Sequence, residues 1–587
     1  MMSGLLTSPA LEAVRHRSRW LAGFACAGAL VSASVLGSSA AVDPPADLVL
    51  LGAEVYTVDP ARSWAQAVAI RDGRIVAVGT NEAAQAVAGP ATRVVDLRGR
   101  MVLPGFHDSH VHPIGGGVEL GQCDLNGLES RDEVFERVRQ YARAHPDRPW
   151  VVGGGFDLPL FPGGSPLKED LDRLVPDRPA FLSSADGHSA WVNSRALQIA
   201  GITRDTPEPE GGRIERRADG EPSGTLRETA ADLVGRHRPK LEPADYRDGL
   251  RRALDMANRF GITALIEASA EAPYLEAYQH ASDAGTLTAR VLVSQHVDPK
   301  EDESQVARIV ARSRATTGRR LQASSAKIFI DGVIEGGTAA LLEPYLDRPG
   351  DRGTLNFEPT KLARIVSALY RERIQVHVHA IGDWGIRATL DALETARRDT
   401  GWTDARPHLA HIQLFAPSDL PRFRSVGAIA NFQPLWAYSD AYIKDLTEPR
   451  LGPARSQWLY PIRSVLDTGT IVVGGSDWSV SSMNPLEAMQ VAVTRRALDA
   501  ADGEAWIPEQ RVGMADMIAA YTANGAYLRR MEHEVGSIEV GKLADLIVVD
   551  RNLFDVPLAE IHKARVQATL LEGEIIWTDG AIAGFDR

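Results

Sequence analysis

The sequence predicts an α/β fold, in which a (β/α)8 TIM-like barrel is joined to a small composite β-domain built from both chain ends. Three observations predict it. Helical segments alternate with apolar strands from about residue 105 to residue 534, which is the pattern of parallel βα units. Polar residues follow almost every one of these strands, and short strands with turns fill both flanking segments. A chain of 587 residues is long enough for both units.

The composition is that of a globular protein. Apolar residues make up 44% and charged residues 24%, which excludes the disordered and fibrous classes. The net charge of −13 gives no support to a nucleic-acid partner, which would need clustered Lys and Arg, and leaves a small-molecule substrate as the expected partner. The two cysteines, Cys26 and Cys123, lie in different segments and offer neither a disulfide framework nor a cysteine metal cluster. Formation of a homo-oligomer is left open.

The first 41 residues have the pattern of a signal peptide. A basic patch at 15–19 precedes an apolar run to about residue 35, and small residues at 38–41 offer a cleavage site. Export to the periplasm or outside the cell is favoured over a single N-terminal membrane anchor, because the apolar run is short and contains Ser and Gly. No stable membrane span is therefore expected in the mature chain.

The two ends of the remaining chain are predicted to form one small β-domain together. Its first half, residues 46–104, contains a strand and then a hairpin at 67–79 about an Asp-Gly turn. Its second half, residues 535–587, contains an apolar strand at 544–550 and a hairpin at 566–577. The barrel is inserted between the two halves.

The barrel segment, residues 105–534, repeats helix and strand. Four helical segments each lead into an apolar strand, in the pairs 251–260 and 261–267, 361–373 and 374–379, 387–399 and 408–412, and 465–468 and 471–477. In such barrels the active site lies at the carboxyl ends of the strands. Residues 121–241 are more than one βα unit needs, so we expect a lid insertion there.

The residues at these strand ends indicate a metal site. His110 and His112 share one face of a strand, because side chains alternate along a strand with period two. A single histidine there would more often be a packed core residue, but six candidate ligands on five strand ends suit Zn, Mn, Fe or Co. The six are His110, His112, Lys327, His379, His411 and Asp477.

The motifs around these residues resemble the amidohydrolase superfamily, whose members are metal-dependent hydrolases on a (β/α)8 barrel. The matching motifs are PGFHDSHVH at 104–112, AKIFIDG at 326–332, HAIGD at 379–383, HIQ at 411–413, GGSD at 474–477 and GSIEVGKLADLIVVD at 536–550. Within the superfamily the chain is most similar to the amidohydrolase family 3 branch, which contains N-substituted formamide deformylases. The segment GHSAWVNS at 187–194 and the pair at 331–332 are characteristic of that branch.

The resemblance implies a role for each candidate ligand. His110 and His112 would bind the more buried metal, and His379 and His411 a second one, with Zn²⁺ in one or two copies. Lys327 would bridge them as a carboxylated lysine, because an ammonium group has no lone pair for a cation. The alternative is a protonated Lys327 beside a single metal.

The resemblance also implies which residues act on the substrate. Asp477 would contact the metal and serve as general base for the attacking water. His188 would hold the substrate carbonyl or oxyanion, with Asn193 bracing the loop or touching substrate.

Two places that should face the substrate depart from the branch pattern. Asp157 and Phe161 lie in the first, at 155–162, and Trp478 directly follows Asp477 in the second. With Trp436, these aromatic side chains suggest an apolar or aromatic substrate portion, and simple packing of the lid explains them equally well.

These observations predict a metal-dependent hydrolase that cleaves a non-peptide C–N bond in an amide, N-substituted formamide, carbamate or cyclic amide. One alternative keeps the metal site but cleaves an ester or another bond. A second alternative is a non-catalytic binding or regulatory protein on the same barrel.

Overall fold

Eight parallel strands form the central sheet in the computed structural model, which describes residues 44–500 and 502–585. The strands follow one another in the sheet in the order in which they occur along the chain, which confirms the predicted barrel. The predicted signal peptide at 1–41 lies outside the described residues. The barrel strands are β8 (Phe106–Val111), β15 (Ile262–Ala270), β16 (Arg290–His296), β17 (Leu321–Phe329), β18 (Gln375–Ala380), β19 (His408–His411), β20 (Ile429–Phe432) and β21 (Val472–Gly474).

The barrel closes where the residues after β21 meet β8. The amide of Asp477 donates to the carbonyl of His110 at 2.7 Å, and the amide of His112 donates to the carbonyl of Trp478 at 2.9 Å. The amide and hydroxyl of Ser476 donate to the two carboxylate oxygens of Asp108 at 2.9 and 2.5 Å. The first and last strand ends are therefore joined at the carboxyl edge of the sheet.

A helix precedes each barrel strand after the first. Helix α10 is an example of how these helices pack. Its residues Leu362, Ile365 and Leu369 are buried at a helical spacing, so one face of the helix packs toward the barrel. Because helices cover the strands, the strand residues are almost continuously buried, including every residue of β8, β18 and β19. These helices are α7 (Pro243–Arg259), α8 (Ala272–Asp283), α9 (Val306–Ala315), α10 (Pro359–Arg371), α11 (Asp383–Thr400), α12 (Leu420–Val426) and α15 (Ile462–Asp467).

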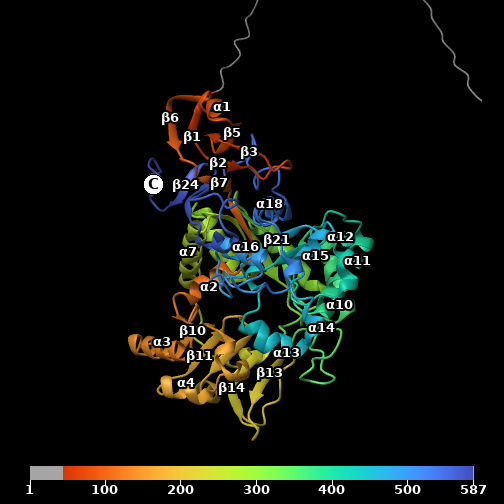
Figure 1. Cartoon of the computed structure of the whole chain (residues 1–587). Coiled ribbons are helices and arrows are strands. Elements are labelled where there is room, and N and C mark those ends of the chain that lie inside the picture. The colour runs from red at the N-terminus through yellow and green to blue at the C-terminus, as the bar shows by residue number, and fades with distance from the viewer. Residues whose placement is uncertain (1–43, 501, 586–587) are drawn as a thin grey trace, which may run out of the picture. The chain divides into compact units, whose positions relative to one another are not determined.

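Two further sheets form the composite β-domain. In Figure 1 the red strands β2 and β7 lie beside the blue strand β24, and all three belong to one sheet with the order β24-β23-β22-β7-β2-β3. The second sheet has the order β5-β4-β1-β6. The strands are β1 (Ala46–Leu51), β2 (Glu54–Tyr56), β3 (Trp64–Ala65), β4 (Ala67–Arg71), β5 (Arg74–Gly79), β6 (Ala88–Asp96), β7 (Met101–Pro104), β22 (Leu546–Val549), β23 (Val566–Leu571) and β24 (Glu574–Thr578).

Both predicted hairpins are present in this β-domain. Asp72 and Gly73 connect β4 to β5 with φ angles of 49° and 74°, and Glu572 and Gly573 connect β23 to β24 with 54° and 77°. Two left-handed residues in a two-residue loop are the geometry of a type I′ turn, which matches the twist of paired strands.

A buried ion-pair cluster joins the barrel to the β-domain. Arg290, the first residue of β16, lies 2.7 Å from a carboxylate oxygen of Asp545 and 2.8 Å from one of Glu572. All three side chains are at most 6% exposed. Burial raises the pKa of Glu572, but hydrogen bonds and charge attraction from Arg320 and Arg290 outweigh it and hold that pKa below its ordinary value.

The insertion forms a sheet of its own. Its order is β13-β14-β12-β11-β10-β9, a structure that its turn-rich sequence did not predict. The elements are β9 (Cys123–Asp124), β10 (Val151–Phe156), β11 (Ala180–Ser184), β12 (Ser189–Val192), β13 (Gly212–Arg216), β14 (Pro222–Glu228), α3 (Arg131–Ala144), α4 (Lys168–Leu174), α5 (Ser194–Ala200) and α6 (Thr229–Gly235).

The remaining α-helices lie in the segments that connect these elements. They are α1 (Asn81–Gln85), α2 (Pro113–Glu119), α13 (Glu448–Leu451), α14 (Pro453–Ser456), α16 (Pro485–Thr494), α17 (Met514–Ala520) and α18 (Ala523–Leu528). Within the described ranges, none of the helices combines the length and the hydrophobicity that crossing a membrane requires.

Removing one carboxylate from the ion-pair cluster should destabilise the fold. In Asp545→Ala, Arg290 loses its bidentate partner while it stays buried, and breaking a buried pair in this way costs about 3–5 kcal/mol. The free energy of unfolding in urea measures this loss. The matched control is Asp255→Ala, which breaks an exposed pair with Arg251 at 3.5 Å and should change stability by less than about 1 kcal/mol. Equal losses in the two variants would contradict the inferred role.

Candidate metal centre

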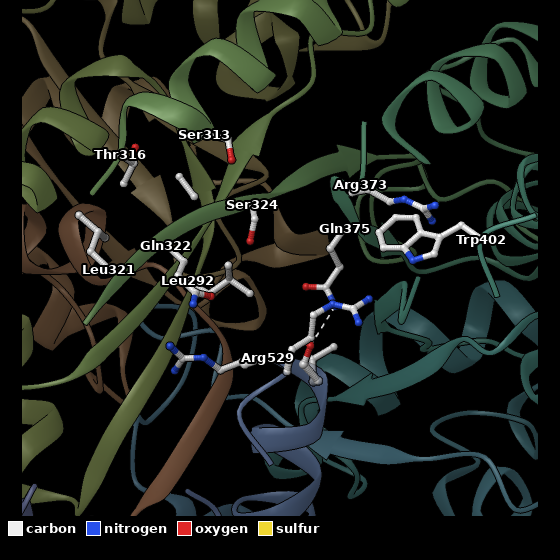
Figure 2. Close-up of a pocket in the computed structure, with 13 residues that line it drawn as sticks. Leu292, Ser313, Thr316, Leu321, Gln322, Ser324, Arg373, Gln375, Trp402 and Arg529 are labelled. Carbon is white, nitrogen blue, oxygen red and sulfur yellow. Dashed lines mark hydrogen bonds between the residues drawn. The ribbon is translucent and has the colours of Figure 1, made fainter. Parts of the chain in front are cut away.

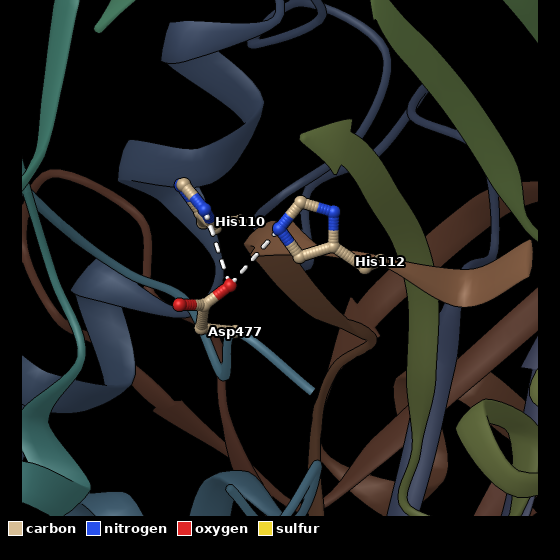
Figure 3. Close-up of side chains that lie close together, drawn as sticks. All are labelled: His110, His112 and Asp477. Carbon is tan, nitrogen blue, oxygen red and sulfur yellow. Dashed lines mark ion pairs between the residues drawn. The ribbon is translucent and has the colours of Figure 1, made fainter. Parts of the chain in front are cut away.

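Three of the predicted ligands meet at the seam of the barrel. Nε2 of His110 lies 3.3 Å and Nε2 of His112 lies 3.2 Å from Oδ1 of Asp477. Figure 3 shows both imidazoles turned toward this carboxylate. One ligand atom from each residue lies within 4.8 Å of the others. This is the group that could hold a metal ion, and the backbone bonds at the seam fix its position.

The other three predicted ligands surround this group. Nζ of Lys327, on β17, lies 3.4 Å from Nε2 of His110. Nδ1 of His411, the last residue of β19, lies 3.9 Å from Oδ2 of Asp477. The ring of His379, on β18, has its centroid 4.6 Å from that of His411. The six side chains therefore form one continuous cluster, with His379 farthest from Asp477 along the chain of contacts.

The backbone at two of these ligands is strained. His411 has a φ of 76° and Asp477 a φ of 53°, in the left-handed region that residues with a Cβ rarely adopt. The residue after His411, Ile412, also has a positive φ of 51°. Such residues cluster at functional sites, where the surrounding structure holds them in place.

The buried imidazoles are held neutral. Burial and the nearby Lys327 lower the pKa of His110 to about 3. Burial also lowers the pKa values of His379 and His411 well below the ordinary range. A histidine binds metal through a neutral imidazole, so these side chains are in the required form at neutral pH.

Lys327 is also shifted toward its neutral form. Its side chain is fully buried, and this burial lowers its pKa to about 7, although Asp477 and Glu267 act in the opposite direction. A buried amine with this pKa is partly uncharged at neutral pH, because burial penalises the ammonium form.

Two buried atoms in the cluster have the chemistry of cation ligands. Among the described residues, Nδ1 of His411 and Oδ1 of Asp477 are buried without a hydrogen-bond partner. Buried polar atoms are nearly always satisfied, and both atoms carry a lone pair that a cation accepts. The donor set of imidazole and carboxylate suits Zn²⁺ and related divalent ions.

Two residues position the imidazoles of His110, on β8, and of His112, which follows that strand. Nε2 of His377 lies 2.8 Å from Nδ1 of His110, which leaves Nε2 of His110 to face Asp477. Oε1 of Glu267, on β15, lies 3.8 Å from Nδ1 of His112, and Tyr278 donates a hydrogen bond to Oε2 at 2.9 Å. Burial raises the pKa of Glu267 to about 7. Glu267 is the last residue of the apolar strand predicted at 261–267. Its place at a strand end was therefore a signal that could have marked it as a residue of the site.

The insertion contributes a charged pair beside the cluster. Nδ1 of His188 lies 2.9 Å from Oε2 of Glu228, and Thr338 donates to Oε1 at 2.7 Å. The rings of His188 and His379 have centroids 5.3 Å apart. Burial lowers the pKa of His188, but the carboxylate of Glu228 outweighs this and raises it to about 9. His188 is thus a protonated hydrogen-bond donor at neutral pH, and no sequence signal linked it to Glu228.

Asn193 lies at the start of α5 and is fully buried. Its side-chain oxygen accepts from the amides of Ala196 and Ala180 at 3.0 and 3.1 Å. Its side-chain nitrogen donates to the carbonyls of Val175 and Arg178 at 3.2 and 2.9 Å. These four bonds favour the bracing role over contact with a substrate.

Two predicted substrate residues lie within the insertion. Phe161 is 3% exposed and its ring packs 5.5 Å from that of Phe156 and 5.4 Å from that of Trp191. This geometry favours the packing explanation for Phe161. Asp157 accepts a hydrogen bond from Tyr442 at 3.2 Å, and burial raises its pKa.

Two predicted tryptophans lie near the cluster. The ring of Trp436 stacks on His411, with centroids 5.6 Å apart and planes 6° from parallel, and it is only partly buried. Trp478 is 7% exposed, and its ring fills the space where a side chain on Gly116 would lie. Of the two, Trp436 has more surface that a substrate could contact.

The chain matches a known family of proteins over most of its length. A family model described as "Amidohydrolase family" matches residues 93–577. The chain belongs to the amidohydrolase family. This confirms the family that the motifs predicted, and family membership supports a metal-dependent hydrolase.

Relatives of similar length support the same assignment. Protein LONG AFTER FAR-RED 3 of Arabidopsis thaliana is 31% identical over 91% of this chain and 92% of its own. An N-substituted formamide deformylase of Arthrobacter pascens is 30% identical over 90% of this chain and 97% of its own. The fold is similar to that of an uncharacterized metal-dependent hydrolase from Pyrococcus horikoshii, with a TM-score of 0.69 and 24% identity over 87% of this chain and 99% of that one.

Removing the carboxylate behind His112 should weaken metal binding. Glu267→Gln keeps the shape but removes the carboxylate that faces Nδ1 of His112, and such outer contacts are worth about 10- to 100-fold in metal affinity. Competition with a chelator measures the affinity for Zn²⁺. Glu276→Gln, an exposed position on α8, is the matched control and should bind as the unaltered protein does. If the two variants bind equally, Glu267 does not position His112.

Proposed function

We propose that this protein hydrolyses a non-peptide C–N bond in an amide, N-substituted formamide, carbamate or cyclic amide, with Zn²⁺ as its metal. The observation that carries the proposal is the carboxylate of Asp477, held between the imidazoles of His110 and His112 near the protonated His188. A base, a hydrogen-bond donor and a set of metal ligands in one buried cluster are the parts that amide hydrolysis needs.

Asp477 is the proposed general base. Burial raises its pKa, but His110 and His112 outweigh this and lower it well below the ordinary range, so the group is ionised. A divalent metal held by this cluster supplies Lewis acidity, which lowers the pKa of water and polarises a carbonyl. Asp477 takes the proton of the attacking water, the C–N bond breaks, and Asp477 returns that proton to the leaving nitrogen.

His188 is the proposed donor to the substrate oxygen. Its Nδ1 is held by Glu228, so the proton on Nε2 is free to stabilise negative charge that develops on the carbonyl oxygen. Thr338 fixes Glu228 in turn, which orients the imidazole before substrate binds. Donors that are fixed in advance stabilise a developing oxyanion without reorganising during the reaction.

Carboxylation of Lys327 is part of the proposal. The partly neutral amine can react with carbon dioxide, and the resulting carbamate offers the oxygen ligands that the amine lacks. In metal-loaded protein incubated with ¹³C-bicarbonate, we expect a carbamate carbon signal that is absent from Lys327→Met. The same spectrum for both proteins would favour a protonated Lys327 beside a single metal.

The relative named as an N-substituted formamide deformylase supports the choice of C–N over ester bonds. A cavity of about 170 Å³ has polar residues and glycines in its lining, including Gly332, Thr338 and the Glu228 that pairs with His188. Trp436, partly buried above His411, offers a flat surface for a planar group on the substrate. N-aryl formamides combine a small polar head with such a group.

The test measures amine release from N-aryl formamides, anilides, carbamates and matched esters, using protein whose metal content has been determined. We expect release from a formamide or amide to fall by at least about 100-fold in Asp477→Asn, because loss of a general base costs 10²–10⁴-fold. Protein that binds no metal would contradict the proposal, and turnover of esters alone would favour the alternative bond.

A second variant tests whether His188 acts as a hydrogen-bond donor to the substrate or as a metal ligand. His188→Gln should lower kcat by about 10²- to 10³-fold, as loss of one oxyanion donor does, while the metal content stays unchanged. His237→Gln, at an exposed position, is the control and should retain full activity. Loss of metal in His188→Gln would place His188 among the ligands.

A further inference from the structure

We propose that a pocket at the amino-terminal end of the barrel, distant from the metal centre along the strands, binds a small organic molecule with an oxyanion head. The pocket has a volume of about 560 Å³. Leu321 and Gln375, the first residues of β17 and β18, line it, whereas Lys327 and His379 lie near the opposite ends of the same strands. None of the candidate metal ligands is among its lining residues.

The charge of the lining points to an anion. Arg373, Arg529 and Arg530 line the pocket, and no acidic residue does within the described part of the chain. Figure 2 shows Arg373 beside Trp402, with Arg529 at a separate wall. Arg530 is paired with Asp404 at 2.6 Å, but across the residues that the structure describes neither Arg373 nor Arg529 has an ion pair. The buried Arg529 thus has no carboxylate of the described chain within ion-pair distance, and Arg373 extends its charge to solvent at the exposed side of the pocket.

Arg529 is the strongest indication of a missing partner. It is 4% exposed, and its Nη1 donates to the carbonyl of Arg290 at 2.8 Å. Its Nε is buried without a hydrogen-bond partner within the described ranges. A buried charge is costly unless it is paired and hydrogen-bonded. A ligand that accepts a hydrogen bond from Arg529 would therefore be stabilised in this pocket.

The rest of the lining indicates the form of the ligand. The guanidinium groups of Arg373 and Arg530 lie over the ring of Trp402, 5.1 and 5.5 Å from its centroid, which gathers positive charge around one aromatic side chain. Leu292 and Leu321 add apolar area, and hydroxyl donors come from Ser313, Thr316 and Ser324. Planar guanidinium groups match the geometry of phosphate and carboxylate oxygens. The volume is that of an ordinary small-molecule site.

The experiment uses phenyl phosphate, which has an oxyanion head and a flat apolar body. Calorimetric titration of the full, zinc-loaded chain should show binding, and phenol, which lacks the charge, should bind far more weakly. Arg373→Gln should weaken phenyl phosphate binding roughly tenfold, the loss expected for one charged hydrogen bond. Arg371→Gln is the matched control, because Arg371 is exposed two residues away and does not line the pocket.

A phosphate could also bind at the metal centre, so Asp477→Asn is titrated in parallel. The proposal requires binding that persists in Asp477→Asn and weakens in Arg373→Gln. Binding that is lost in Asp477→Asn and unchanged in Arg373→Gln assigns the anion to the metal centre and overturns the proposal. Equal binding of phenol, or no heat at millimolar phenyl phosphate, also overturns it. None of these outcomes depends on catalytic activity, so the proposed function is tested separately.

Discussion

Closure of the barrel is the constraint on which the site depends. The hydrogen bonds that join β8 to the residues after β21 run through the backbone of His110, His112 and Asp477, and the side chains of these same residues form the group that could hold a metal ion. The carboxylate of Asp108 holds Ser476 at this seam. Forming the barrel and assembling the centre are therefore one event, and a change that opens the seam would separate the ligands.

The same constraint explains where the backbone is strained. Positive φ angles at His411 and Asp477 cost of the order of 1–3 kcal/mol each, and a free loop would relax them. Both residues lie at the carboxyl ends of strands whose pairing holds them in position. The insertion acts in the same way from outside the barrel, because Glu228 and Thr338 fix His188 beside the cluster.

The sequence predicted the barrel, the composite β-domain and a clustered ligand set, because each ligand ends an apolar run or lies in a recognisable motif. It did not predict the pairing of His188 with Glu228, since the two lie 40 residues apart. The many glycines and prolines of that segment indicated turns, so its sheet was not predicted. Nor could the sequence decide whether Phe161 packs the insertion or faces substrate, because an aromatic residue serves both. Only the ring contacts with Phe156 and Trp191 favour packing.

The composite β-domain has a consequence for synthesis on the ribosome. In its mixed sheet, Leu103 of β7 pairs with Ile547 of β22. The early strand therefore cannot form this pair until a strand near the end of the chain has been synthesised. At 5–20 residues per second this delay is roughly 20–90 s. During that interval one edge of β7 has no partner strand, and an unpaired edge is a template for aggregation. The nascent chain thus needs protection for most of its synthesis, and premature termination leaves that edge permanently open.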